Sequence, residues 1–135
     1  MVDGDDPEAR LDALPREPAR ERRAPEGARA DRIRALNDRF RGSPQPDLGK
    51  IMVTREVSGI GQAQIVLLIT RISVYRRFDT KTDPTGLHES GVLEQAGRCY
   101  RWRIDYFDLA YAGPASDPAD PQACRRVLTV MGPEG

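Results

Sequence analysis

Apolar residues recur along the chain with two periods, and the changes of period mark the expected elements. Near residue 30 the spacing is helical, because Ile33, Leu36 and Phe40 stand three and four residues apart on one stripe. The stripe predicts a helix over 30–41, which the Gly-Ser-Pro sequence at 42–44 would end. The other faces of this helix carry charges of both signs, and we expect them to be solvated.

The next two segments predict a strand and a long helix. Residues 50–57 alternate, which places Ile51, Val53 and Val57 on one side of an extended chain. In residues 62–77 large apolar side chains recur three or four apart, which favours a helix. The same run is rich in β-branched residues, so a strand is the alternative.

The second half of the chain predicts antiparallel strands. Residues 87–95 lead into Ala96-Gly97, a dipeptide suited to a tight hairpin turn. Residues 98–108 then alternate strictly, with aromatic residues and Ile104 on one face. Two Asp-Pro pairs predict a short helical turn before a last strand over 125–131. The expected fold is α+β, with two helices packed on one face of a mainly antiparallel sheet of about four strands, in the order α-β-α-β-β-β.

Composition adds a tail and excludes several classes of protein. Residues 1–27 hold thirteen charged residues and four prolines, which leaves too little apolar surface to offset the entropy of ordering. We therefore expect a disordered tail followed by a single domain over 28–135. Basic and acidic residues balance at 21 each, so no overall charge favours nucleic acid. No apolar run approaches the ~18 residues of a spanning helix. A cytoplasmic protein without a cofactor, a metal or a membrane contact is expected.

The single histidine, His88, lies in the stretch TDPTGLHESG. Within it, Asp83-Pro84-Thr85-Gly86 has the signature of a type I turn, which accounts for those four residues without any function. His88 itself stays open. It would be a general base oriented by Asp83, Asp105 or Asp108, a metal ligand with those carboxylates or with Cys99, a contact residue, or a histidine satisfied by a neighbouring group.

Two side chains near His88 in the sequence are candidate nucleophiles. Ser90 would share a strand face with His88, and Cys99 is one of only two cysteines. Neither has a Gly-x-Ser-x-Gly elbow or recognisable oxyanion donors around it. We therefore expect no nucleophilic catalysis from either residue.

Arginines alternate with aromatic residues in RCYRWRIDYF. On an open sheet face the aromatic residues would stack on bases while the arginines hold phosphates. The strict alternation favours a different account, in which the aromatic face is core and Arg101 and Arg103 point to solvent. The candidate binding surface then consists of Arg101, Arg103, Asp105 and the loop that carries His88.

Six segments of the chain occur together in a recognisable order: RIRALNDRFR, KIMVTREV, DPTGLHESG, YRWRIDYFD, DPADP and RVLTVM. As a set they resemble an uncharacterised family of small bacterial proteins catalogued as a domain of unknown function, over about residues 31–131. Thr82 stands where that family has Asn. Ser90, two residues after His88, stands where that family often has an aromatic residue. The resemblance implies no established reaction. Genes of the family often lie on plasmids and phage-derived islands, which implies an accessory role.

Three hypotheses of function follow. The first is a non-enzymatic protein-interaction protein of a mobile element, such as an inhibitor of a host defence complex of the anti-CRISPR kind. The second is a nucleic-acid-binding module that uses the arginine-rich strand and the first helix. The third is a small hydrolase or metal-dependent enzyme centred on His88, with Asp83, Asp105 and Asp108 as the candidate catalytic carboxylates.

Overall fold

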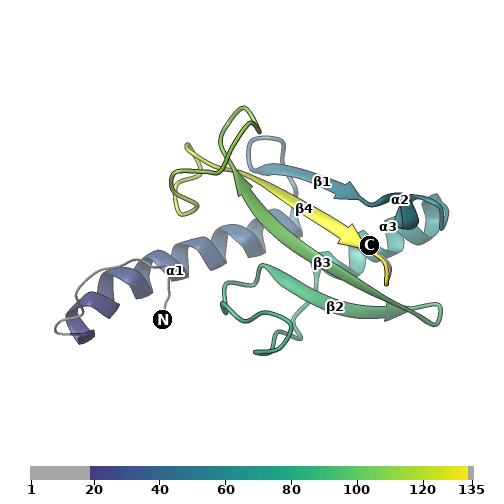
Figure 1. Cartoon of the computed structure of the whole chain (residues 1–135), viewed down its shortest axis with the longest axis horizontal. Coiled ribbons are helices and arrows are strands. Elements are labelled where there is room, and N and C mark those ends of the chain that lie inside the picture. The colour runs from purple at the N-terminus through teal and green to yellow at the C-terminus, as the bar shows by residue number, and fades with distance from the viewer. Residues whose placement is uncertain (1–18, 134–135) are drawn as a thin grey trace.

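The structure is a computed structural model that describes residues 19–133, with side chains from residue 27 onward. Within this part the chain forms three helices and four strands (Figure 1). Their order is α1 (Ala19–Gly42), β1 (Gly49–Val53), α2 (Arg55–Ser58), α3 (Gln62–Ser73), β2 (Ser90–Gln95), β3 (Arg98–Phe107) and β4 (Arg125–Met131). The predicted α+β class is confirmed.

The four strands form one sheet in the order β1-β4-β3-β2. β2, β3 and β4 pair antiparallel, as predicted, and Ala96 and Gly97 make the β2–β3 turn with φ of 52° and 77°. β1 pairs parallel with β4, which the sequence pattern does not indicate. Gly49 permits this pairing, since a Cβ there would collide with the backbone of Arg126.

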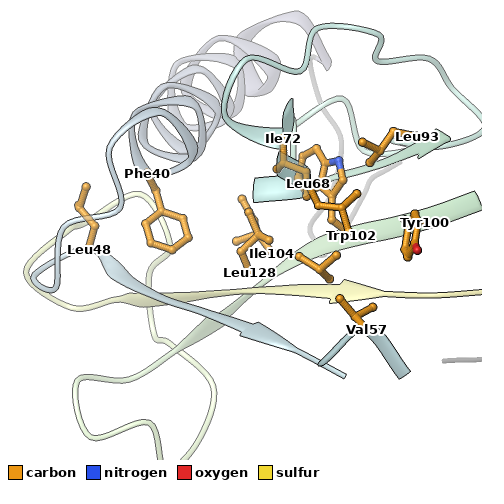
Figure 2. Packing of buried hydrophobic residues seen from close by; sticks show 11 residues of the cluster. Phe40, Leu48, Val57, Leu68, Ile72, Leu93, Tyr100, Trp102, Ile104 and Leu128 are labelled. Atoms are coloured by element: carbon orange, nitrogen blue, oxygen red, sulfur yellow. The ribbon is translucent and has the colours of Figure 1, made fainter. Parts of the chain in front are cut away.

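The core lies between one face of the sheet and the helices α1 and α3 (Figures 1 and 2). Tyr100, Trp102 and Ile104 of β3 point into it and are at most 3% exposed, which confirms the predicted inward face of that strand. Phe40 of α1 and Leu68 of α3 meet them from the helix side, and both are fully buried. Among residues 19–133 no helix covers the opposite face of the sheet (Figure 1).

Both long helices differ in extent from the prediction. α1 begins at Ala19 and so includes residues 19–27 of the predicted tail, a segment rich in the strong helix formers Ala, Arg and Glu. Residues 1–18 of that tail lie outside the described part. α3 is helical, as predicted, but ends at Ser73 because Arg41 Nη1 of α1 donates to the carbonyl oxygens of Ile72 and Tyr75.

Two predicted strands are shorter than expected. The strand predicted over 50–57 ends at Val53, because the chain turns at Thr54, whose carbonyl accepts from Ser58 N–H at 2.9 Å. Val57 is nevertheless fully buried, since the short helix α2 turns it into the core. The strand predicted over 87–95 begins only at Ser90, because the three residues before it bond to α1 and to the preceding turn.

Each of the two Asp-Pro pairs forms a single turn, in which Asp120 N–H donates to the Asp117 carbonyl and Ala123 N–H donates to the Asp120 carbonyl, both at 3.0 Å. Asp117 Oδ1 accepts the N–H of Ala119 at 3.0 Å, and Asp120 Oδ1 accepts the N–H of Gln122 at 2.9 Å. Each aspartate therefore closes a local turn with the backbone two residues on, and the chain does not continue into a helix. The last strand occupies residues 125–131 as predicted.

Candidate functional site

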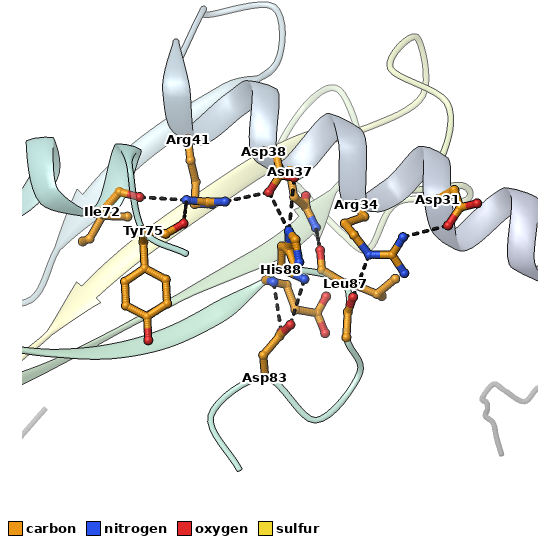
Figure 3. A network of polar contacts seen from close by, with 12 residues as sticks. Asp31, Arg34, Asn37, Asp38, Arg41, Ile72, Tyr75, Asp83, Leu87 and His88 are labelled. Carbon is orange, nitrogen blue, oxygen red and sulfur yellow. Dashed lines mark hydrogen bonds and ion pairs between the residues drawn. The ribbon is translucent and has the colours of Figure 1, made fainter. Parts of the chain in front are cut away.

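One face of α1 presents polar side chains to the loop over residues 82–90 (Figure 3). Arg34 stands three and four residues before Asn37 and Asp38, so these side chains project from one side of the helix. Arg34 Nε donates to the carbonyl oxygen of Gly86 at 2.9 Å, and Asn37 Nδ2 donates to that of Leu87 at 3.0 Å. Asp38 bonds the next residue along the loop, His88. The helix therefore fixes the path of this loop.

His88 forms a pair with Asp38. Its Nδ1 lies 2.9 Å and 3.1 Å from the two carboxylate oxygens of Asp38, and its ring stacks on Phe78 with centroids 3.9 Å apart and planes at 4°. Because a carboxylate accepts, Nδ1 carries the proton of this bond. No group among the described residues bonds Nε2. The side chain is 29% exposed, so the pair leaves Nε2 available to a ligand.

The backbone at His88 is also held in an unusual conformation. Its φ is 57°, in the left-handed region that non-glycine residues seldom adopt. The buried carboxylate of Asp83 accepts the N–H groups of His88 and Glu89 at 2.9 and 3.1 Å. The predicted turn is present, since Gly86 N–H donates to the Asp83 carbonyl at 3.0 Å. Asp83 therefore holds the backbone and does not orient the imidazole.

Arg41 joins the pair to the core. Its Nη2 donates to Asp38 Oδ1 at 2.6 Å, and its guanidinium lies over the rings of Phe78 and Trp102 at 5.1 and 5.3 Å. The side chain is only 4% exposed. Asp38 thus accepts hydrogen bonds from two partners, the buried Arg41 and the partly exposed His88.

A hollow of about 480 Å³ opens beside this cluster. It lies where α1, the end of α3 and the His88 loop meet. Its lining comprises Asp38, Arg41, Ser73, Val74, Tyr75, Arg76, Phe78 and His88. The lining therefore combines charged groups with an apolar and aromatic wall.

A second network of hydrogen bonds lies next to this cluster. Arg126 Nε donates to Asn37 Oδ1 at 2.6 Å, Asn37 Nδ2 donates to Tyr106 Oη at 2.9 Å, and Tyr106 O–H donates to Glu89 Oε1 at 2.5 Å. Burial raises the pKa of the Glu89 carboxyl, and burial beside Glu89 raises the pKa of Tyr106 well above its ordinary value. Burial also lowers the pKa of Arg126. This hydrogen-bond network links β4, α1, β3 and the His88 loop.

The other candidate binding residues lie on the open face of the sheet, away from the His88 ring. Arg101 and Arg103 are exposed, and Arg103 Nε donates to Asp105 Oδ2 at 3.0 Å. Asp108 is occupied in a local turn, where its Oδ1 accepts the N–H groups of two residues that follow it. The structure therefore brings Arg103 and Asp105 together but places neither Asp105 nor Asp108 beside His88.

Neither candidate nucleophile reaches the imidazole. Ser90 Oγ donates to the carbonyl oxygen of Thr82 at 2.5 Å. Cys99 is exposed on β3, on the open side of the sheet. Among the described residues no group of three or more His, Cys, Asp or Glu side chains is arranged to hold a metal ion.

Sequence reasoning found His88 but missed its partners. Asp38 and Arg41 belong to charged faces of the first helix that were expected to be solvated, and Arg41 is buried instead. The available signal was the spacing of Arg34, Asn37, Asp38 and Arg41 along one helix face, next to the apolar stripe.

A comparison with protein families finds one match. The family model described as protein of unknown function (DUF3768) covers residues 53–135. The matched part contains His88, Arg101, Arg103 and Asp105, whereas Asp38 lies before it. No curated protein and no solved structure matches the chain. Within the described residues no helix is long and apolar enough to cross a membrane.

Proposed function

Since the chain belongs to the DUF3768 family of proteins of unknown function, we propose a function from its surfaces: it is a non-enzymatic protein-binding module that docks its partner on the open face of the sheet. The observation that carries the proposal is the composition of this face. Its side chains are those that alternate with the core residues of each strand.

Three rows of side chains cross the open face, as the strand register defines them. One row joins Lys50, Val127 and Asp105; the next joins Met52, Thr129, Arg103 and Ser90; the third joins Met131, Arg101 and Val92. Apolar and basic side chains are therefore neighbours in the first and third rows, and Thr129 separates Met52 from Arg103 in the second. Met52 is 47% exposed, which leaves a large flexible apolar side chain at the surface.

This composition matches protein interfaces better than it matches a solvated sheet surface. Methionine and arginine are both enriched where proteins bind one another. Four basic residues (Lys50, Arg101, Arg103 and Arg125) face two acidic ones (Glu94 and Asp105) on this side of the sheet. The excess of two positive charges favours a partner with an acidic surface around an apolar centre.

Binding of single-stranded nucleic acid is the weaker alternative. Stacking on bases requires exposed aromatic rings, whereas Tyr100 and Trp102 of the arginine-rich strand are 3% and 1% exposed. Inhibition of a host defence complex, which the sequence hypothesis named, is one form of the proposed role.

A matched pair of charge reversals tests the proposal. The partner is recovered with a tagged chain from cells that naturally carry the gene, and then purified and titrated. We expect Arg101→Glu to weaken the Kd at least about tenfold, because it places a negative charge in the contact surface. Arg32→Glu, on an exposed position of α1, is the control and leaves the Kd unchanged. Equal affinity of both variants would overturn the proposal.

A further inference from the structure

The hollow beside His88 lies on the helix side of the sheet, so partner binding on the open face does not account for it. We infer that this hollow is a binding site for a small organic phosphate, held between Arg76 and His88. Four features of the hollow support this ligand: unused hydrogen-bonding groups, the net charge of the lining, its size and apolar wall, and an imidazole that is already held in place.

Besides the buried Nε of Arg41, two groups at the hollow have hydrogen-bonding capacity that the described residues leave unused. Arg76 is exposed, lines the hollow, and makes no hydrogen bond or ion pair with another described residue. His88 uses Nδ1 for Asp38 and keeps Nε2 free. The Arg76 guanidinium is a donor that phosphate oxygens accept from, and His88 Nε2 is a second such donor when the imidazole is protonated.

The formal charges around the hollow favour an anion. Arg41 and Arg76 contribute two positive charges and Asp38 one negative charge, which leaves +1 when His88 is neutral and +2 when it is protonated. A phosphate monoester carries a charge between about −1.5 and −2 near neutral pH. A dianionic phosphate therefore matches the charge of the site, and a monoanionic carboxylate matches it less well.

The size and the wall favour an organic molecule over the free ion. The hollow has about 480 Å³, within the range of about 300–1,000 Å³ that is typical of small-molecule sites. Val74, Tyr75 and Phe78 line it beside the charged groups. These side chains would cover the organic part of a phosphate ester.

The imidazole is held in place before any ligand arrives. Asp38 fixes its Nδ1, Phe78 stacks on its ring, and Asp83 holds its backbone N–H. Binding would therefore cost little ordering of this side chain.

Titration of the full chain with phenyl phosphate, followed by the nitrogen signals of the His88 imidazole, tests the inference. The matched variants are Arg76→Gln and Arg77→Gln, because Arg77 is exposed next in the chain but does not line this hollow. We expect saturable shifts of the imidazole signals, a Kd weakened at least about tenfold by Arg76→Gln, and no change with Arg77→Gln. Melting curves verify that both variants are folded.

Titrations with inorganic phosphate and with benzoate test separately whether the organic part and the phosphate group of phenyl phosphate are recognised. Inorganic phosphate that shifts the same signals with lower affinity supports an organic phosphate site. Benzoate that binds as tightly as phenyl phosphate overturns the assignment to phosphate. Unmoved His88 signals, or equal losses in the two arginine variants, overturn the site itself.

Discussion

Nδ1 of His88 lies 2.9 Å from Oδ1 of Asp38, a residue fifty positions earlier in the chain. The pair joins the His88 loop, which lies within the family match, to a helix that the match does not include. Asp38 also accepts from Arg41 at 2.6 Å, so one carboxylate links the loop, the helix and the aromatic core.

Replacement of Asp38 should loosen this link. Asp38→Ala removes the acceptor of both His88 and the buried Arg41, and we expect a loss of about 1–3 kcal/mol of unfolding free energy in urea. Asp31→Ala is the control, since Asp31 is 74% exposed and pairs with no described residue other than Arg34; its expected loss is within ~0.5 kcal/mol. Equal losses in the two variants would contradict the role given to Asp38.

Replacement of Asn37 should lower the unfolding free energy more than replacement of Asp38 does, although Asn37 is polar and lies on a helix. It is fully buried, accepts from Arg126, and donates to Tyr106 and to the Leu87 carbonyl. Asn37→Ala leaves Nε of the buried Arg126 guanidinium without its acceptor and removes the donor to Tyr106 and Leu87, and we expect a loss of about 3–5 kcal/mol. The measurement is again urea unfolding, and a loss below about 1 kcal/mol would show that the network adds little.

Gly91 should tolerate no side chain. A Cβ there would lie 2.7 Å from Trp102 Nε1 and 2.7 Å from the ring of Tyr75. Gly91→Ala is expected to cost about 1–3 kcal/mol through overpacking and to lower the melting temperature. Gly113→Ala is the matched control, because its nearest neighbour would be an Asp108 oxygen at 3.8 Å. A melting temperature that falls equally in both variants would refute the packing account.

The buried Glu89 predicts a pH dependence of stability. Burial raises its pKa in the folded state above the ordinary value of 4.5, so the folded state holds this proton more tightly than the unfolded state does. Its contribution to stability is therefore fully present below about pH 4.5 and is lost as the pH rises through the folded pKa.

Comparison of the wild type with Glu89→Gln isolates this effect. The unfolding free energy of the wild type minus that of the variant should fall as the pH rises above about 4.5. Glu94→Gln, at an exposed position on β2, serves as the control with a flat difference. A difference that stays level or rises for Glu89→Gln would contradict the predicted sign.

The sequence predicted the elements better than their pairing. Helical spacing located α3 despite its β-branched residues, and alternation gave β3 its buried Trp102 face. The parallel pairing of β1 with β4 was missed, because a period of two says which face is buried but not which strand is adjacent. Strand ends were missed where side chains of α1 hold the loop backbone.

The candidate site was only half predictable for a related reason. Asp83 and Gly86 follow a local turn rule, and His88 stood out as a single residue. Its carboxylate partner is fixed by tertiary packing of α1 on the loop, and no spacing rule connects residues 38 and 88. Buried polar residues such as Asn37 and Arg126 were missed because their hydrogen-bonding partners lie far away in the sequence.

Site-specific photo-crosslinking tests the proposed binding face most directly. A photoreactive residue is placed at Thr129, in the central row of the open face, or at Thr70, an exposed position on α3. In cells that naturally carry the gene, we predict one protein adduct from the Thr129 variant, absent when Arg101→Glu is added, and none from the Thr70 variant. Adducts from Thr70 alone, or a Thr129 adduct that Arg101→Glu leaves unchanged, would contradict binding through the open face of the sheet.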